Sequence, residues 1–433
     1  MKRLQAWIAG MATAVVIAAG AAAADSPAAL ATRLLDQLDA GQYAAAEATF
    51  SPQMKAAVPA HKLKAMWESL PVLLGAAGAR GEATVSEADG FRIVAIPLAY
   101  ARDNVLARVV LDGDDRIAGF LVQPPPPPPP PPAADASFSE QAITLPALAS
   151  GKPGLPGTLT LPRGKGPFPA VVLVHGSGPQ DRDETIGGNR PFLDIARGLA
   201  AHGIASLRYD KRTRARPQDF SGTFGIDDET TDDAVAAVTA LAGNAAIAHD
   251  RIHVLGHSQG GLLAGRIAAR SQGKVAGLIL LAAPARPILD LLGEQNRYLA
   301  HLDGSVSAEE QAHLDALDAA IAKVRRDPAA KLLELPGHYW QQLERIDPVA
   351  DARASQLPVL LLQGGRDFQV VDADWQRWKQ GLQGPRYRFH LYPALNHLGI
   401  AGEGKGTLDE YGKPGHVDAT LIQDIVRWVQ AQE

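Results

Sequence analysis

A serine flanked by glycines is the first feature of this sequence that could do chemistry. Residues 256–261 read GHSQGG, with Ser258 between the apolar run RIHVLGH and the small-residue stretch LLAGRIAAR. Glycines around a serine permit a tight strand-to-helix turn that exposes its hydroxyl, and the helix N-terminus directs backbone amides toward that turn. An ordinary polar turn carries the same letters, because a bare G-x-S-x-G is common by chance. The pattern therefore predicts a nucleophile only if an acid and a base follow it along the chain.

Candidates for that acid and that base come after later apolar runs. Asp367 ends PVLLLQGGRD, and His397 follows YRFHLYP in a loop. Both lie at the carboxyl ends of predicted parallel strands, the edge where functional side chains meet in such sheets. Asp372 and Asp374 are alternatives for the acid, and His416 is the alternative for the base. The order serine, acid, histidine is that of a triad built on an α/β sheet.

The oxyanion of an acyl-transfer reaction needs two hydrogen-bond donors. We expect one to be the backbone amide of Gln259, the residue after the serine. The other should come from the loop VHGSGPQ after the first strongly buried strand. Ser177 is the favoured residue there, with Gly176 and Gly178 as alternatives, and His175 is expected to hold the loop by a hydrogen bond.

Two further segments contain residue types that also occur in ligand sites. DRDE (181–184) is expected to join an ion-pair network, because Lys211, Arg212 and Arg214 follow the neighbouring strand. It lacks a histidine–carboxylate spacing suited to zinc. GEGKGT lacks the Walker spacing and a preceding strand, which argues against nucleotide binding. The sequence therefore predicts neither a metal nor an organic cofactor.

Residues 139–433 alternate apolar strands with helices, which predicts a mostly parallel sheet with flanking helices. The strands are expected at residues 171–176, 204–210, 251–257, 276–284, 358–367 and 387–393. The helices are expected at about 190–202, 228–242, 260–270 and 418–431. Between about 285 and 347 the pattern is helical without strands, as in a lid over the carboxyl edge of the sheet.

The preceding part of the chain has a different character. Residues 25–122 begin with helical periodicity and continue with three strand-like runs, which predicts a small α+β domain. It contains no charged or histidine-rich cluster, so we interpret it as a packing or partner-binding module. Residues 123–138 contain nine consecutive prolines, Pro124–Pro132. Such a run forms a stiff polyproline II spacer, although it could also be a ligand for a partner.

The chain starts with MKR, an apolar stretch and AAAADSP, which predicts a secretory signal peptide over residues 1–24 with cleavage after Ala24. A retained membrane anchor is the alternative. The expected location is the periplasm or the exterior. There are no cysteines, which excludes disulfides and a cysteine nucleophile. Without Lys2 and Arg3, 40 basic face 47 acidic side chains, a net charge of −7 that argues against nucleic-acid binding.

Several longer stretches resemble one family. HGSGPQDRDETIGGNRPFLDIARGLAAHGIASLRYDKRT, GHSQGG, GGRDFQV and LNHLGIAGEGK together are similar to exported bacterial α/β-hydrolases of the EstD-type carboxylesterase family. That family is related to the serine aminopeptidases and dienelactone hydrolases and carries an N-terminal domain of unknown function. The resemblance implies Ser258 as nucleophile, Asp367 as acid and His397 as base. The segment GHYWQQLERIDPV (337–349) resembles the end of the family's lid, which implies Tyr339 and Trp340 as pocket residues, with simple lid packing as the alternative.

The sequence thus predicts an α/β-hydrolase fold preceded by a small α+β domain. The expected function is an exported serine hydrolase that cleaves small carboxylic esters through an acyl-enzyme, without stable membrane insertion. A serine aminopeptidase or dipeptidyl-peptidase-like hydrolase is the alternative, and a non-catalytic cell-envelope binding module is a third. An aminopeptidase would need a buried carboxylate for the substrate ammonium, for which Glu294 and Glu344 are candidates. The oligomeric state and the natural ester stay open.

Overall fold

The structure is a computed structural model that describes residues 26–88, 91–123, 130–133, 135–220, 223–333 and 335–432. The predicted signal peptide and Pro124–Pro129 lie outside the described residues. The chain divides into two units, one with residues 131–216 and 223–432, the other with residues 26–130 and 217–220. No helix among the described residues combines the length and the apolar character needed to cross a bilayer.

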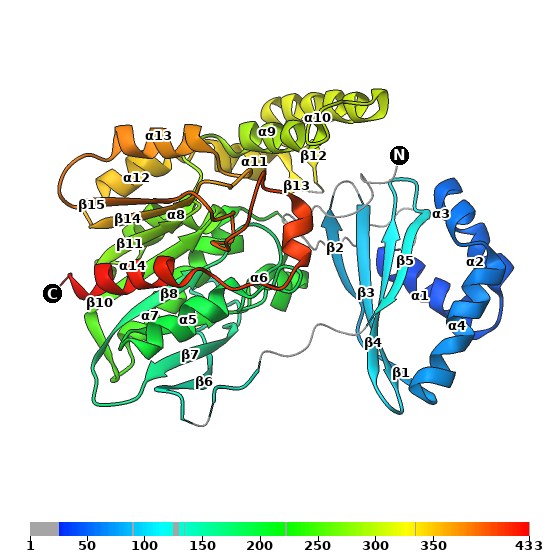
Figure 1. Ribbon diagram of the computed structural model, residues 1–433, viewed down its shortest axis with the longest axis horizontal. Coiled ribbons are helices and arrows are strands. Elements are labelled where there is room, and N and C mark those ends of the chain that lie inside the picture. Colours follow the sequence, from blue (N-terminus) through cyan, green and yellow to red (C-terminus); the bar gives the residue numbers. More distant parts are fainter. Residues whose placement is uncertain are drawn as a thin grey trace. The chain divides into compact units, whose positions relative to one another are not determined.

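An eight-stranded sheet forms the centre of the larger unit (Figure 1). Its strand order is β15-β14-β11-β10-β8-β9-β7-β6, parallel from β15 to β9, with β7 and β6 added antiparallel at one edge. The bounds are β6 Phe138–Thr144, β7 Pro156–Pro162, β8 Phe168–Val174, β9 Ala205–Tyr209, β10 Ile247–His257, β11 Gly277–Leu281, β14 Val359–Gly364 and β15 Tyr387–Tyr392. The mostly parallel sheet confirms the predicted fold class, and all six predicted strands are present.

Helices cover this sheet, and apolar periodicity explains where they lie. The helices α5 Pro191–Ala201 and α14 Ala419–Gln430 share one core cluster with alternate residues of the central strands, among them Leu173 of β8 and Leu255 of β10. The helices α7 Asp232–Ala242 and α8 Gln259–Arg270 pack on β10 as well. The strands β11 and β14 are buried over their whole length and β8 over its last five residues, as expected for parallel strands covered on both faces.

The segment expected to be a lid lies between β11 and β14, at the top of Figure 1. It contains α9 Ile288–Ala300, α10 Ala308–Arg326, α11 Gly337–Glu344 and α12 Pro348–Ala354. The expectation that it has no strands is wrong, because β12 Lys331–Leu332 pairs with β13 Leu335–Pro336. Each of these strands has only two residues, too few for a periodic pattern. The helix α13 Asp372–Gly381 follows β14.

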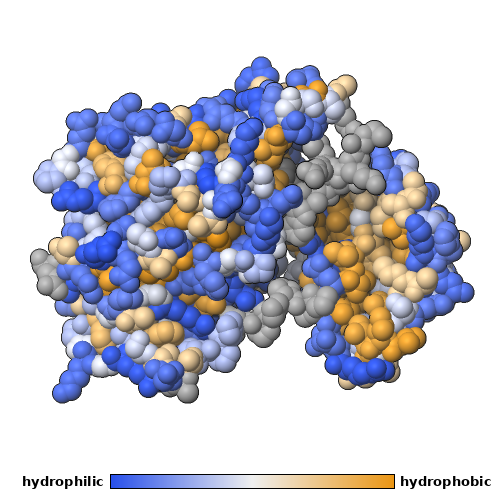
Figure 2. Space-filling model, in the orientation of Figure 1, coloured by the Kyte–Doolittle hydropathy of each residue, from blue (hydrophilic) through white to orange (hydrophobic). Residues whose placement is uncertain are grey.

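The smaller unit packs helices α1 Pro27–Asp39, α2 Tyr43–Ala48, α3 Pro52–Ala57 and α4 Ala60–Leu74 with an antiparallel sheet. The sheet contains β1 Ala77–Arg80, β2 Thr84–Ala88, β3 Phe91–Tyr100, β4 Asn104–Leu111 and β5 Ile117–Gln123. The sequence predicted only the last three strands. On this unit the exposed large apolar side chains include Phe91 and Leu121 of the sheet, and Figure 2 shows hydrophobic residues gathered on the visible face.

Candidate active site

Ser258 occupies a strained turn between β10 and α8. Its backbone has φ 51° and ψ −120°, a conformation that non-glycine residues rarely adopt. The Ser258 N–H donates to the carbonyl of Leu281 on β11 at 2.9 Å, and the Ser258 carbonyl accepts the backbone amides of Gly261 and Leu262 in the first turn of α8. A strained strand-to-helix turn with a serine at its apex is the geometry of a nucleophile elbow.

The glycines around Ser258 are required by close backbone packing. A Cβ on Gly256 would lie 2.2 Å from the carbonyl oxygen of Gly260, and a Cβ on Gly260 would lie 2.3 Å from that of Val174 on β8. A Cβ on Gly261 would lie 2.5 Å from the Cβ of Ala283. No side chain fits at these distances, so the glycines are what allows the turn to sit against β8 and the end of β11.

Asp367 and His397 come together where β14 and β15 end. The Nδ1 of His397 lies 2.8 Å from Oδ2 of Asp367, and both side chains are buried. Asn396 shapes the loop, because its Oδ1 accepts the backbone N–H groups of Leu398 and Ile400. With Nδ1 engaged by Asp367, the other ring nitrogen of His397 is left to act as a base.

Asp367 is surrounded by donors that hold its carboxylate in one orientation. Its Oδ1 accepts the backbone amides of Gln369 at 2.8 Å and Val370 at 3.0 Å. Its Oδ2 accepts Nε2 of Gln363 at 3.1 Å in addition to the imidazole N–H. These four hydrogen bonds fix the orientation of the Asp367 side chain toward His397.

The alternative acids and the alternative base lie in other environments. Asp374 is buried and pairs with Arg286 at 2.8 Å, next to the start of the lid. Asp372 lies in the first turn of α13, where its carboxylate accepts a hydrogen bond from the side-chain amide of Gln376. The side chain of His416 is 88% exposed and lies 3.1 Å from Asp194 of α5. None of these three is bonded to the partner that its proposed role would require.

The loop after β8 passes close to the nucleophile. A Cβ on Gly176 would lie 3.2 Å from the Cβ of Ser258. The Gly176 amide donates to Oε1 of Glu184 at 2.7 Å, so it is engaged and unsuited to an oxyanion. The predicted donors, the amides of Ser177 in this loop and Gln259 at the start of α8, lie on the two segments that meet here. His175 donates from Nε2 to the carbonyl of Asp181, which holds the loop as expected.

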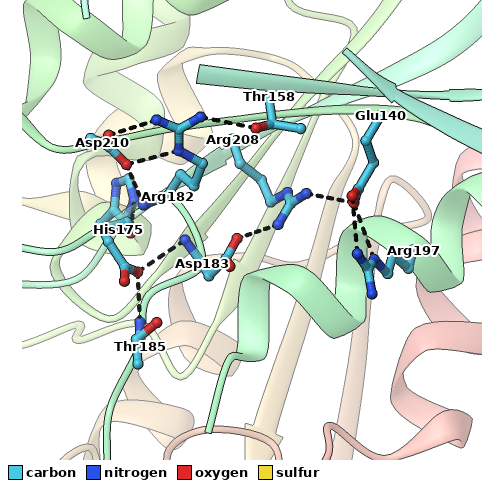
Figure 3. A network of polar contacts seen from close by, with 10 residues as sticks. Glu140, Thr158, His175, Arg182, Asp183, Thr185, Arg197, Arg208 and Asp210 are labelled. Atoms are coloured by element: carbon cyan, nitrogen blue, oxygen red, sulfur yellow. Dashed lines mark hydrogen bonds and ion pairs between the residues drawn. The ribbon is translucent and has the colours of Figure 1, made fainter. Parts of the chain in front are cut away.

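An ion-pair network anchors the same loop to the sheet (Figure 3). Arg182 makes a bidentate pair with Asp210, with distances of 2.9 and 2.7 Å. Asp183 pairs with Arg208, a β9 residue only 2% exposed that also reaches Glu140 of β6. The predicted network is therefore present, but the expected basic partners were wrong. Lys211 and Arg212 instead pair with acidic residues that follow them, and among the described residues no group of three histidine, aspartate or glutamate side chains is placed to hold a metal.

A second buried cluster joins the elbow to the lid. Lys211 donates from Nζ to Glu229 at 2.7 Å and to the carbonyl of Gly176 at 2.8 Å. The other Glu229 oxygen accepts the hydroxyl of Tyr339 and, at 3.0 Å, the side-chain amide of Gln259. Burial and the Glu229 charge raise the pKa of Tyr339 well above its usual value, so its phenol stays neutral and donates.

The two predicted lid aromatics thus have different surroundings. Tyr339 reaches the side chain of Gln259, next to the nucleophile, at 3.3 Å. Trp340 donates its indole N–H to the carbonyl of Leu332 in the lid hairpin at 3.0 Å. Tyr339 is brought to the site, whereas the indole hydrogen bond of Trp340 lies within the lid.

Sequence reasoning missed two residues beside the nucleophile, Glu184 and His257. The Oε2 of Glu184 lies 3.0 Å from Nδ1 of His257, and Nε2 of His257 lies 2.9 Å from the backbone carbonyl of His397. Glu184 belongs to the DRDE segment and His257 to GHSQGG, but no local sequence pattern indicates that these two side chains are in contact. Their contact puts the residue before Ser258 against the backbone of the candidate base.

These elements can together perform nucleophilic acyl transfer. A strained serine, an imidazole held by a carboxylate, and two loops with backbone amides are the groups that such a reaction needs.

Comparisons with known proteins agree with this architecture. Residues 167–403 match a family described as serine aminopeptidase, S33, and residues 31–120 match a protein family of unknown function, DUF3887. The chain is 37% identical over 387 residues to esterase EstD of Thermotoga maritima, an alignment that covers 88% of this chain and 89% of that protein.

Solved structures with similar folds include the esterase domain of a Rhodothermus marinus protein and an esterase of Pyrobaculum calidifontis. The first is 18% identical with a TM-score of 0.41, covering 68% of this chain and 98% of that chain. The second is 17% identical with a TM-score of 0.42, covering 68% of this chain and 84% of that chain.

Proposed function

The chain belongs to the family of carboxylesterase-type α/β-hydrolases that includes esterase EstD, and from this premise we propose that it is an exported serine esterase with Ser258, Asp367 and His397 as its triad. The proposed substrates are small carboxylic esters. The observation that carries the triad is the strained turn at Ser258, with φ 51°, beside a His397–Asp367 pair at 2.8 Å.

In the proposed mechanism, Oγ of Ser258 attacks the ester carbonyl while Nε2 of His397 takes the hydroxyl proton. Asp367 accepts the Nδ1–H of His397 and stabilises the imidazolium that forms. The amides of Gln259 and Ser177 donate to the oxyanion. The C–O bond then breaks, and the alcohol leaves with the proton from His397. Water adds to the acyl-enzyme by the same route and releases the acid.

The surroundings of the carboxylates favour an esterase over an aminopeptidase. A substrate ammonium needs an unpaired carboxylate in the site, because a buried charge without a partner is costly. Glu294 makes two hydrogen bonds to Arg286 at 2.7 Å, and Glu344 pairs with Arg325 at 2.7 Å. Both candidates for ammonium binding are therefore already neutralised by arginines.

Export is proposed from the N-terminal sequence alone. A basic start, an apolar stretch and a small-residue site before Asp25 are the pattern of a signal peptide. N-terminal sequencing of protein expressed from the full-length gene tests this. A mature chain that begins at Asp25 in the periplasmic fraction supports export, and an intact N-terminus in the cytosol contradicts it.

The reaction itself is tested with p-nitrophenyl esters and aminoacyl anilides on one preparation. Acetate and butyrate esters should be hydrolysed faster than octanoate, because a helical lid limits the acyl pocket. Ser258→Ala should abolish both turnover and labelling by a fluorophosphonate probe. Ester hydrolysis by Ser258→Ala at the wild-type rate would disprove the nucleophile, and anilide cleavage that rivals the ester rate would assign the chain to the peptidases.

A further inference from the structure

His257 is a buried histidine with an acceptor at each ring nitrogen. Its Nε2 lies 2.9 Å from the backbone carbonyl oxygen of His397, which can only accept a hydrogen bond. Its Nδ1 lies 3.0 Å from a carboxylate oxygen of Glu184, an ion-pair contact without a hydrogen bond between the two atoms. Because His257 lowers the pKa of Glu184, the carboxylate is ionised, and a proton on each ring nitrogen makes both contacts favourable. The ring is then an imidazolium.

Glu184 ties this histidine to a second loop. The residue is 1% exposed and adopts φ 53°, and Asp181 supports the turn around it by accepting the amides of Asp183 and Thr185. While Oε2 faces His257, Oε1 accepts the amide of Gly176 at 2.7 Å. One carboxylate thus contacts both the loop after β8 and the end of β10.

The surroundings of the two residues support opposite charges. Burial alone would lower the pKa of His257, but the Glu184 carboxylate offsets burial and raises it above the usual value. Burial alone would raise the pKa of Glu184, but His257 brings it below its usual value. Asp367 and the ring of His397 also face His257. On the other side His175 faces Glu184, with Lys211 and Asp181 nearby, and burial lowers the pKa of His175 to about 4, which leaves it neutral.

We propose that Glu184 and His257 are positioning residues, a buried carboxylate–imidazolium pair that fixes the loop after β8 and the loop of His397 in one geometry around Ser258. The inference rests on the proposed function. Asp367 sets the rotation of the His397 ring through Nδ1, and His257 holds the backbone from which that ring extends. Glu184 holds Gly176, the residue before the proposed oxyanion donor. Three segments that are distant in sequence thereby meet at fixed distances from the nucleophile.

Substitutions at Glu184 separate the geometry of this pair from its charge. In Glu184→Gln the side-chain oxygen can still accept the Gly176 amide, and its NH₂ can donate to Nδ1 of a neutral His257. That neutral ring still donates from Nε2 to His397. Glu184→Ala removes both contacts.

We expect Glu184→Ala to lower kcat per active site by about 10²-fold, the loss typical of small misplacements in a catalytic site. KM should be unchanged, because only the transition state is affected. Glu184→Gln should retain most of kcat.

The pH profile gives a readout that a merely structural role would not move. In the wild type, kcat/KM should fall at alkaline pH as the His257 imidazolium loses a proton, since a neutral ring cannot donate to both acceptors. Glu184→Gln should lack this fall, because its pair is neutral at every pH of the assay. An identical alkaline fall in both proteins, or an Ala variant with wild-type kcat, would overturn the inference.

The matched control is His253→Gln. His253 lies on the same strand and the same face as His257 and is equally buried, but its ring packs on Trp428 at a centroid distance of 5.5 Å. His253→Gln should keep the wild-type pH profile and the wild-type kcat per active site, where active sites are counted by fluorophosphonate labelling. A loss equal to that of Glu184→Ala would show that any damage to β10 suffices, which overturns a specific positioning role.

NMR of histidine-labelled protein tests the charge without relying on activity. At neutral pH both ring nitrogens of His257 should carry protons in the wild type, and only one in Glu184→Gln. An unprotonated Nδ1 in the wild type would refute the pair. Absence of ester turnover in the wild type would instead refute the proposed function, and the NMR result would still decide whether the pair exists. If Glu184→Ala fails to fold, the Gln variant carries both tests.

Discussion

Asp367→Asn is the substitution that tests the proposed acid most directly. The carboxylate accepts two hydrogen bonds on each oxygen, from the amides of Gln369 and Val370 on Oδ1 and from Gln363 and His397 on Oδ2. An asparagine has one oxygen, so its NH₂ must face one of these pairs of donors. The two backbone amides are fixed, and the asparagine oxygen should stay with them.

The NH₂ group then faces His397 and Gln363. Gln363 cannot turn over freely to accept it, because its own amide also donates to the carbonyls of Gly364 and Val370. His397 can accept it only by moving its proton from Nδ1 to Nε2. An imidazole with the proton on Nε2 cannot take the proton of Ser258, which in serine hydrolases lowers kcat by about 10⁴-fold, or about 5 kcal/mol of barrier. The asparagine NH₂ and the side-chain amide of Gln363 are both donors, so neither satisfies the other. This should also reduce the free energy of unfolding by about 1–3 kcal/mol.

The assay is kcat on p-nitrophenyl butyrate per active site, with urea denaturation for stability. Asp374→Asn is the matched control, a buried carboxylate that follows the same strand but accepts the amides of Ala285 and Arg286. It should lose about 1–3 kcal/mol of stability by the same unsatisfied-donor argument while kcat stays at the wild-type value. An Asp367→Asn enzyme within tenfold of wild type, or an equal loss of kcat in Asp374→Asn, would refute this reasoning.

Three further expectations concern the elbow, the base and the buried pair. Gly260→Ala should yield protein without fluorophosphonate labelling, because the added Cβ would lie 2.3 Å from a carbonyl oxygen of β8; normal labelling would refute the packing argument. His397→Ala should lower kcat by several orders of magnitude and His416→Ala should leave it unchanged, and the reverse result would exchange their roles. Glu184 has a lowered pKa, so its contribution to stability is lost as pH falls below about 4.5. His257 has a raised pKa, so its contribution to stability is full below 6.5 and is lost as pH rises through the raised value. Urea denaturation should therefore show the largest stability difference between wild type and His257→Gln near pH 5.5, and a difference that grows toward pH 9 would contradict the ion pair.

The parts of the fold that were predictable from the sequence depend on short-range patterns. Buried parallel strands are continuous apolar runs, and the glycines of GHSQGG stand at fixed offsets from Ser258, so both can be read locally. The positions of Asp367 and His397 followed from one rule, that chemistry gathers at the carboxyl ends of such strands. Their contact at 2.8 Å is consistent with that rule.

The missed elements lack such local signals. Strand β6 reads FSEQAIT and is only partly buried, because it lies at the sheet edge and pairs on one side with β7. The contact of Glu184 with His257 joins residues 73 positions apart, and it exists only once β8 and β10 are neighbours. Long-range pairing of charges follows from the topology, so the sequence indicated a network around DRDE but not its partners.

Three buried carboxylates in this part of the fold are each paired with a cationic side chain, and Asp367 differs from them. Glu184 is matched by His257, Glu229 by Lys211, and Asp183 by Arg208, each at ion-pair distance and each buried. Asp367 instead faces the imidazole of His397, a side chain without the permanent charge of a lysine or an arginine. The field of the Asp367 carboxylate is therefore not cancelled in advance by a fixed cation on its own oxygens. In the proposed mechanism it acts most strongly when the His397 imidazolium forms, which is the step at which stabilisation would accelerate the reaction.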